Sequence, residues 1–150
     1  NYALATVGAR VYLPLTSPTY SVPYRSSALQ WWSAFTGARV IAGRPPSVAL
    51  VPSVLPGQCW ALSGRHGQLA VVLAIPAFPV AFTLSHISSH ASLLGDEGLR
   101  AAPRGTFHLS SSVRQMLRHQ LGQPVPIVLL RIQSNWGHEP WTCVYNLQVH

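Results

Sequence analysis

The chain has 150 residues, of which 48% are hydrophobic and only 9% are charged, whereas a typical domain is about 25% charged. This length suits a single domain, residues 1–150, with a hydrophobic core of its own. The formal net charge is +7, but the 10 basic residues are scattered arginines, and the lack of a basic run argues against a nucleic-acid-binding surface.

Short apolar runs separated by Pro and Gly, mostly with a two-residue period, predict β-strands along the chain. In chain order, the predicted strands are residues 47–53, 59–64, 68–75, 80–87, 105–111, 126–133 and 142–150. The segments 26–35 and 112–121 stay ambiguous, because the first could form helical turns or a hairpin and the second a helix or a strand. Short strands at roughly ten-residue spacing favour an all-β sandwich or barrel.

Burial and turns can also be predicted for some of these strands. The apolar run 126–133 is expected to be a buried strand, and "PAFP" (76–79) is expected to be the turn between two others. The last run alternates, which predicts a half-buried strand. One face would carry Cys143, Tyr145, Leu147 and Val149, and the other Thr142, Val144, Asn146 and Gln148.

The residues offer little for catalysis or for a metal centre. A nucleophile needs a neighbouring His and an orienting acid, but the chain has only three acidic residues, Asp96, Glu97 and Glu139. His86 and His90 are the closest pair of histidines, and their spacing between a strand and a loop defines no ligand geometry. We therefore expect the chain not to be an enzyme and its histidines to be solvated loop residues.

Neither a membrane span nor a signal peptide is predicted. The longest apolar run, 69–82, has 14 residues and two prolines, fewer than the ~17–25 residues that a span needs. The first residues lack a charged region followed by an apolar one, so any membrane anchor would lie outside these residues. Cys59 and Cys143 form no CxxC motif, so they are either two buried thiols or one long-range disulfide.

Four stretches together resemble the SUN domain family. They are "PGQCWAL" (56–62), "GRHGQLAVVL" (64–73), "FTLSHI" (82–87) and "LRIQSNWGHEPWTCVYNLQVH" (130–150). The resemblance implies a jelly-roll-like β-sandwich, similar to galactose-binding domains, that lies between the two nuclear membranes and trimerises above an upstream coiled coil. It also implies binding of the C-terminal KASH peptide of nesprin-like outer-nuclear-membrane proteins, which bridges nucleus and cytoskeleton as part of the LINC complex.

The resemblance assigns roles to particular residues. It implies a disulfide between Cys59 and Cys143, which an oxidising perinuclear space permits. His86 and Tyr145 match the residues that line the pocket for the peptide's terminal carboxylate, and both side chains can donate hydrogen bonds to it. Ala101 stands where the family places a Ser that helps to hold the carboxylate, so one donor is lost.

The loop 48–59 matches a family loop that wraps a monovalent cation such as K⁺ with backbone carbonyls. The matching residues are Val48, Val51, Ser53, Gln58 and Tyr145. The family often has Asp where this chain has Ser53, so the charge of the site is lost even if the carbonyls keep their positions.

Further differences concern the ends of the binding surface. Thr16 replaces a Cys that cross-links some members to the peptide, a pattern similar to the shorter testis-associated members. A stretch near 110–113 is shorter than in the family, which indicates either a sheet that lacks one strand pair or an aberrant splice or gene model. The lid hairpin would span about 21–44, where Trp31 and Trp32 either contact the peptide or cover this domain's own core.

Trp136 is expected to fill the core. The alternative function is that of a lectin-like or discoidin-like β-sandwich that binds sugars or lipid headgroups, favoured by the low charge and by a loop aromatic, Trp141.

Overall fold

In the residues that the structure describes, β-strands make up most of the regular structure, together with three short 3-10 helices. The computed structural model describes residues 1–21, 43–55, 57–85, 104–108, 122–135 and 139–150. The helices are η1 (Ala5–Val7), η2 (Leu13–Leu15) and η3 (Pro46–Leu50). The strands are β1 (Arg10–Val11), β2 (Trp60–Ser63), β3 (Gly67–Ala77), β4 (Ala81–Ser85), β5 (Arg104–His108), β6 (Val125–Ile132), β7 (Trp141–Val144) and β8 (Asn146–Val149). In this part of the chain, no helix is long and apolar enough to cross a membrane.

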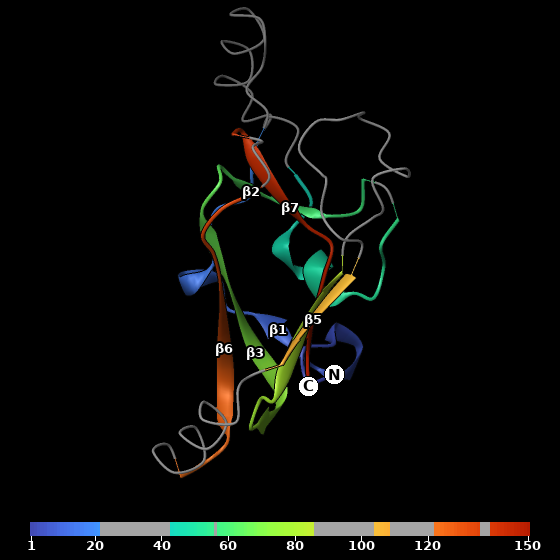
Figure 1. Ribbon diagram of the computed structural model, residues 1–150, viewed down its shortest axis with the longest axis vertical. Helices are drawn as coiled ribbons and strands as arrows, with labels where there is room; N and C mark the ends of the chain where they lie inside the picture. Colours follow the sequence, from blue (N-terminus) through green and yellow to red (C-terminus); the bar gives the residue numbers. More distant parts are fainter. Residues whose placement is uncertain (22–42, 56, 86–103, 109–121, 136–138) are drawn as a thin grey trace, which may run out of the picture.

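The strands form two three-stranded antiparallel sheets and one two-stranded ribbon. Their orders are β1-β3-β6, β5-β4-β8 and β2-β7. Figure 1 shows β3 and β6 as a long pair and the two ends of the chain next to each other. The backbone N–H of Tyr2 donates to the carbonyl of Val149 at 2.8 Å, which joins those ends. The protein is an all-β sandwich, as predicted.

The hydrophobic core brings together side chains from both sheets, the ribbon and η3. Its largest fully buried apolar side chains are Trp60, Leu50, Leu62, Leu69, Leu147 and Val71. Burying each Leu or Val side chain stabilises the fold by about 1.5–3 kcal/mol. The indole N–H of Trp60 donates to the hydroxyl of Thr19 at 3.0 Å, so the largest core residue leaves no polar group unpaired.

Four predicted strands are confirmed in the parts that the structure describes. They are 59–64 as β2, 68–75 as β3, 80–87 as β4 up to Ser85, and 105–111 as the backbone of β5 up to His108. The expected turn 76–79 is shorter than predicted, because β3 continues through Pro76 to Ala77. The β3–β6 register shifts between Val72 and Ala77, a stretch that contains a proline unable to donate to the ladder.

The prediction of a strand at 47–53 is wrong. Residues Pro46–Leu50 form the 3-10 helix η3 instead. Pro45 precedes it with φ −64° and ψ 155°, and Pro46 stands at the first helical position, where a missing N–H costs nothing. The helix buries Ala49 and Leu50, so the apolar residues of the run reach the core without a strand.

The prediction of a buried strand at 126–133 is correct for the strand and wrong for its burial. Within the described residues, β6 pairs only with β3 and therefore forms an edge of its sheet. Val128, Leu130 and Ile132 pack against the core, whereas Ile127 and Leu129 on the other face are 39% and 43% exposed. Antiparallel sheets commonly pack one face on the core and leave the other in solvent.

The last predicted strand is divided at Tyr145. β7 pairs with β2, and β8 pairs with β4, so the chain passes from the ribbon to a sheet. Val144 and Asn146 are 2% and 1% exposed, contrary to the expected half-buried alternation. Packing of η3 against β8 contributes to this burial. The segments 26–35 and 112–121 lie outside the described residues.

Candidate functional site

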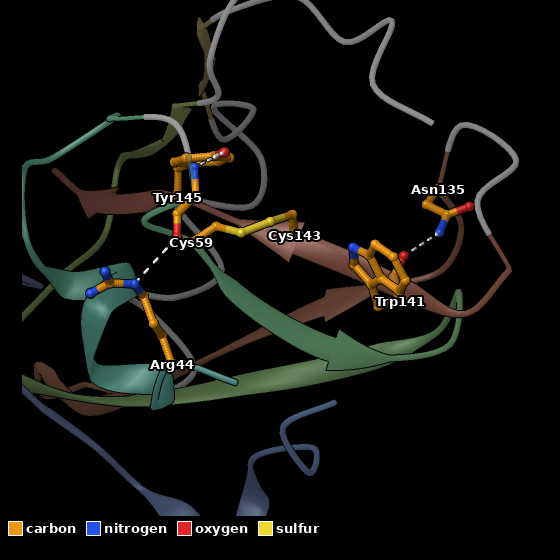
Figure 2. Close-up of a disulfide and its surroundings, with 7 residues drawn as sticks. Arg44, Cys59, Asn135, Trp141, Cys143 and Tyr145 are labelled. Carbon is orange, nitrogen blue, oxygen red and sulfur yellow. Dashed lines mark hydrogen bonds between the residues drawn. A yellow bond between two sulfur atoms is a disulfide. The ribbon is translucent and has the colours of Figure 1, made fainter. Parts of the chain in front are cut away.

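A disulfide ties the loop before β2 to the terminal strands. Cys59 and Cys143 are bonded across a sequence separation of 84 residues, with their Cα atoms 5.6 Å apart. The antiparallel pairing of β2 with β7 brings them together, because Ala61 lies opposite Cys143. The disulfide expected from the family resemblance is therefore confirmed (Figure 2).

Tyr145 makes a second connection to this loop, at the break between β7 and β8. Its side chain is only 3% exposed, and its hydroxyl accepts a hydrogen bond from the backbone N–H of Gly57 at 3.4 Å. Burial raises the pKa of the phenol, and the hydrogen bond with Gly57 lowers it by less. The hydroxyl is therefore neutral at physiological pH and keeps its proton as a donor.

The loop is also held from its other side by Arg44. The guanidinium Nε–H donates to the carbonyl of Gly57 at 3.2 Å (Figure 2). Gly57 has φ 73°, a left-handed conformation that glycine adopts without strain. The N–H and the carbonyl of Gly57 are thus both hydrogen-bonded, the N–H to Tyr145 and the carbonyl to Arg44.

Asn146 makes a third connection from the terminal strands. Its side chain is 1% exposed, and its Nδ2 donates to the carbonyl of Val51 at 3.0 Å. The same carbonyl accepts the backbone N–H of Ser53 at 2.7 Å. Gln148 completes the group, because its Nε2 donates to the Oδ1 of Asn146 at 2.9 Å.

The residues expected to hold a monovalent cation are all described. The carbonyl of Val48 accepts the N–H of Val51 at 3.1 Å, and the carbonyl of Val51 has the two donors just described. A carbonyl oxygen has two lone pairs, so that of Val51 has none left for an ion. No group of three or more His, Cys, Asp or Glu side chains gathers anywhere in the described residues. The arrangement at Val51 therefore does not fit a cation ligand.

The expected peptide site is described only in part. His86, Ala101, Trp31 and Trp32 lie outside the described residues, as does Trp136. Tyr145 is described, and so are the strand ends that flank the other two pocket positions.

Those strand ends meet at one end of the β5-β4-β8 sheet. Ser85 is the last residue of β4 and the chain neighbour of His86, and it lies opposite Asn146, the chain neighbour of Tyr145. On its other side, Ser85 lies opposite Arg104, which follows Ala101 by three positions.

Trp141 packs against this domain rather than standing free in a loop. Its ring lies 5.0 Å from that of Tyr20, at a tilt of 34°. Its backbone carbonyl accepts a hydrogen bond from Asn135 Nδ2 at 3.3 Å (Figure 2), and the same amide donates to the hydroxyl of Thr142 at 2.9 Å. The aromatic residue that favoured the lectin-like alternative thus has a structural role.

Several residues of this site were not predicted. Asn146 carried no signal of burial, because period-two alternation places it on the polar face together with Gln148. The contacts of Arg44 and Gly57 could not be predicted, because neither residue type indicates which distant group it will hydrogen-bond to. The structure also shows an apolar pocket of about 480 Å³ beside β6, whose lining includes Pro79, Phe82, Ile127, Leu129, Leu147 and Val149.

Comparison with known proteins agrees with the geometry. The family model described as "Sad1 / UNC-like C-terminal" matches residues 40–115 and 98–150. The two matches overlap at residues 98–115, which include the region near 110–113 that the sequence predicts to be shortened.

Curated relatives cover the whole chain. Human SUN domain-containing protein 5 is 32% identical and human SUN domain-containing protein 3 is 30% identical, each over 100% of this chain. Human sperm-associated antigen 4 protein is 33% identical, also over 100% of the chain. These alignments run over 168, 172 and 171 positions, so each relative has residues without a counterpart among the 150 of this chain.

The chain spans less than half of these relatives, namely 43%, 46% and 38% of their lengths. The all-β sandwich, the Cys59–Cys143 bond and the family match together show that this chain is a member of the SUN domain family.

Proposed function

We propose that this chain binds the C-terminal KASH peptide of an outer-nuclear-membrane protein in the perinuclear space. By holding that peptide, it connects the nucleus to the cytoskeleton as part of a LINC complex. The observation that carries this proposal is the meeting of three strand ends at one end of the β5-β4-β8 sheet. Ser85 lies between Asn146 and Arg104 there; Ser85 and Asn146 are the chain neighbours of His86 and Tyr145, and Arg104 follows Ala101 by three positions.

The chemistry of these positions suits a terminal carboxylate. The neutral phenol of Tyr145 can donate a hydrogen bond, and His86 can donate another from its imidazole. The formal charge of +7 also attracts an anionic group. Ala101 supplies no hydroxyl, so the pocket has one donor fewer than the family pattern. The peptide backbone would add as a strand along the lid at residues 21–44, with Trp31 and Trp32 against its apolar side chains.

The proposed setting follows from the family. The domain lies in the perinuclear space, and a membrane helix upstream of it anchors the protein in the inner nuclear membrane. An upstream coiled coil holds three copies together, because a linked assembly raises the effective concentration of the domains. The role is structural rather than enzymatic. Light scattering on a chain extended upstream through the coiled coil tests the trimer, and a clean monomer would contradict it.

Peptide binding is tested by isothermal titration with a synthetic KASH C-terminal peptide. The matched control is the same peptide with an amidated C-terminus, which removes the negative charge and one acceptor oxygen. We expect binding of the free carboxylate form and at least tenfold weaker binding of the amide. Equal binding of both forms, or binding of neither, would overturn the proposed function. Binding to a glycan array instead would support the lectin-like alternative.

A further inference from the structure

The loop at 51–59 is closed by bonds that come from the chain itself. The disulfide holds it at Cys59, the Tyr145 hydroxyl at Gly57, and the Asn146 amide at Val51. The three residues that hold the loop, Cys143, Tyr145 and Asn146, all lie at the junction between β7 and β8. Of these connections, the one to Val51 occupies an atom that the family resemblance assigns to a cation.

The Val51 carbonyl is fully engaged by the two hydrogen bonds it receives. Ser53 N–H lies 2.7 Å from it and Asn146 Nδ2 lies 3.0 Å from it. A cation held by backbone carbonyls draws on the same lone pairs, with its positive charge where a donor hydrogen would lie. The Asn146 N–H group places a partial positive charge at this position already.

Burial makes the Asn146 contact a fixed part of the fold. The side chain is 1% exposed, so water cannot replace the bond to Val51. Leaving a buried polar group unpaired costs more than making the bond gains. Gln148 fixes the orientation of the amide, because its Nε2 donates at 2.9 Å to Oδ1 and so leaves Nδ2 pointing at the loop.

The lack of negative charge at the loop also disfavours a bound cation. None of the five residues expected to hold the ion is acidic, since Ser53 stands where an Asp would supply a negative charge. Glu139 is the only acidic residue in the described part of the chain, and its nearest described partner is Arg65, at 3.9 Å. A cation at the loop would therefore add to a net charge of +7 without a compensating anion.

We propose that the Asn146 side-chain amide takes the place of the monovalent cation and closes the loop at Val51 without an ion. The stability of this domain is then independent of K⁺. This inference concerns folding alone and does not depend on whether the domain binds a peptide.

The test compares thermal unfolding of the wild-type chain in potassium chloride and in choline chloride at equal ionic strength. The organic cation is too large for carbonyl ligation, so the difference between the two salts reports a K⁺ site. Asn146→Asp is the informative variant, because it keeps the shape of the side chain, cannot donate to Val51 and brings a negative charge. Gln148→Ala is the matched control, since it removes the neighbouring amide that orients Asn146 but brings no negative charge to the loop.

We expect the wild-type Tm to be equal in the two salts to within about 1 °C. This is less than the 2–4 °C shift that a change of ~1 kcal/mol in the free energy of unfolding produces in a domain of this size. Asn146→Asp should lower the Tm in choline chloride by on the order of 5 °C, and potassium chloride should restore at least half of that loss. Gln148→Ala should respond to both salts alike.

Two results would overturn the proposal. One is a wild-type Tm that rises in potassium chloride relative to choline chloride. The other is an Asn146→Asp variant that is no more sensitive to K⁺ than the wild type. The wild-type comparison decides the matter by itself if the variant does not fold.

Discussion

The hydroxyl of Tyr145 lies 3.4 Å from the backbone nitrogen of Gly57, a residue 88 positions earlier in the chain. This bond crosses from the junction of β7 and β8 to the turn before Cys59. The disulfide lies two residues away on each side, so the phenol and the sulfur bridge hold the same turn. Tyr145, which is proposed to bind the peptide, thus also stabilises the turn at Gly57.

Replacing Tyr145 with Phe should remove a pH dependence of stability. Because burial raises the pKa of the phenol, the folded state binds its proton more tightly than the unfolded state. Its contribution is complete below the unfolded pKa of about 10 and is lost as the pH rises through the higher folded value. Urea unfolding between about pH 8 and 11 measures this.

In that series, the wild type should lose more stability above about pH 10 than Tyr145→Phe does. Below that pH, the variant should be less stable by about 0.5–1.5 kcal/mol, because the Gly57 N–H loses its acceptor. Tyr12→Phe is the control, since Tyr12 is 39% exposed. Identical pH profiles for the wild type and Tyr145→Phe would contradict the prediction.

The disulfide should make a large contribution to stability. A loop of this length gives ~4–5 kcal/mol in the chain-entropy estimate, and measured values are often smaller. We expect Cys59→Ser/Cys143→Ser to unfold at a lower urea concentration than the wild type, and reductant to have the same effect on the wild type only. Without reductant, the intact mass should be about 2 Da below the dithiol value. Two thiols that alkylate freely in the native protein would refute the bond.

Restoring the missing hydroxyl should improve the proposed peptide site. A hydrogen bond to a charged group contributes ~1.5–3 kcal/mol, so Ala101→Ser should tighten binding of the free carboxylate peptide by roughly ten- to a hundredfold. The amidated peptide should be unaffected, and His86→Ala should weaken binding of the free carboxylate form alone. If Ala101→Ser and His86→Ala both leave the affinity unchanged, the carboxylate binds elsewhere.

The exposed edge of the β1-β3-β6 sheet should cause weak self-association. Ile127 and Leu129 are 39% and 43% exposed on β6, whose outer edge has no partner strand among the described residues. Apolar, unpaired edges favour strand pairing between molecules, and a Lys on the edge opposes it. Leu129→Lys should therefore lower the concentration-dependent mass seen by sedimentation, whereas Gln123→Lys outside the strand should not. Equal association of both variants would contradict this.

The sequence predicts strands well where the hydrophobic pattern is local, as in β2, β3 and β4. It fails where the outcome depends on distant neighbours. The apolar run at 47–53 becomes η3 because two prolines begin it, and the exposed face of β6 depends on which segments pack against each face of its sheet.

The same distinction holds for the site. Cys59 and Cys143 could be paired because their motifs resemble those of a family, whereas spacing alone left two alternatives. Asn146 was assigned to an exposed face, because alternation does not indicate that the strand changes sheets at Tyr145 or that η3 covers it. Residues at a break between two strands are therefore the ones that period-two patterns misplace.

The joined ends of the chain determine how a mechanical load would pass through this domain. The side-chain oxygen of Asn1 accepts the N–H of Val149 at 3.0 Å, and the N–H of Tyr2 donates to the Val149 carbonyl at 2.8 Å. Tension applied upstream of Asn1 is thus transferred directly to β8 and from there to Tyr145 and Cys143 in the same strand run. A ligand held at Tyr145 would be pulled along this short path, while the N–H of Ala74 in β3 donates to the carbonyl of Tyr2 at 2.9 Å and joins the β1-β3-β6 sheet to the same point. A load that enters at the first two residues is therefore divided between β8 and β3.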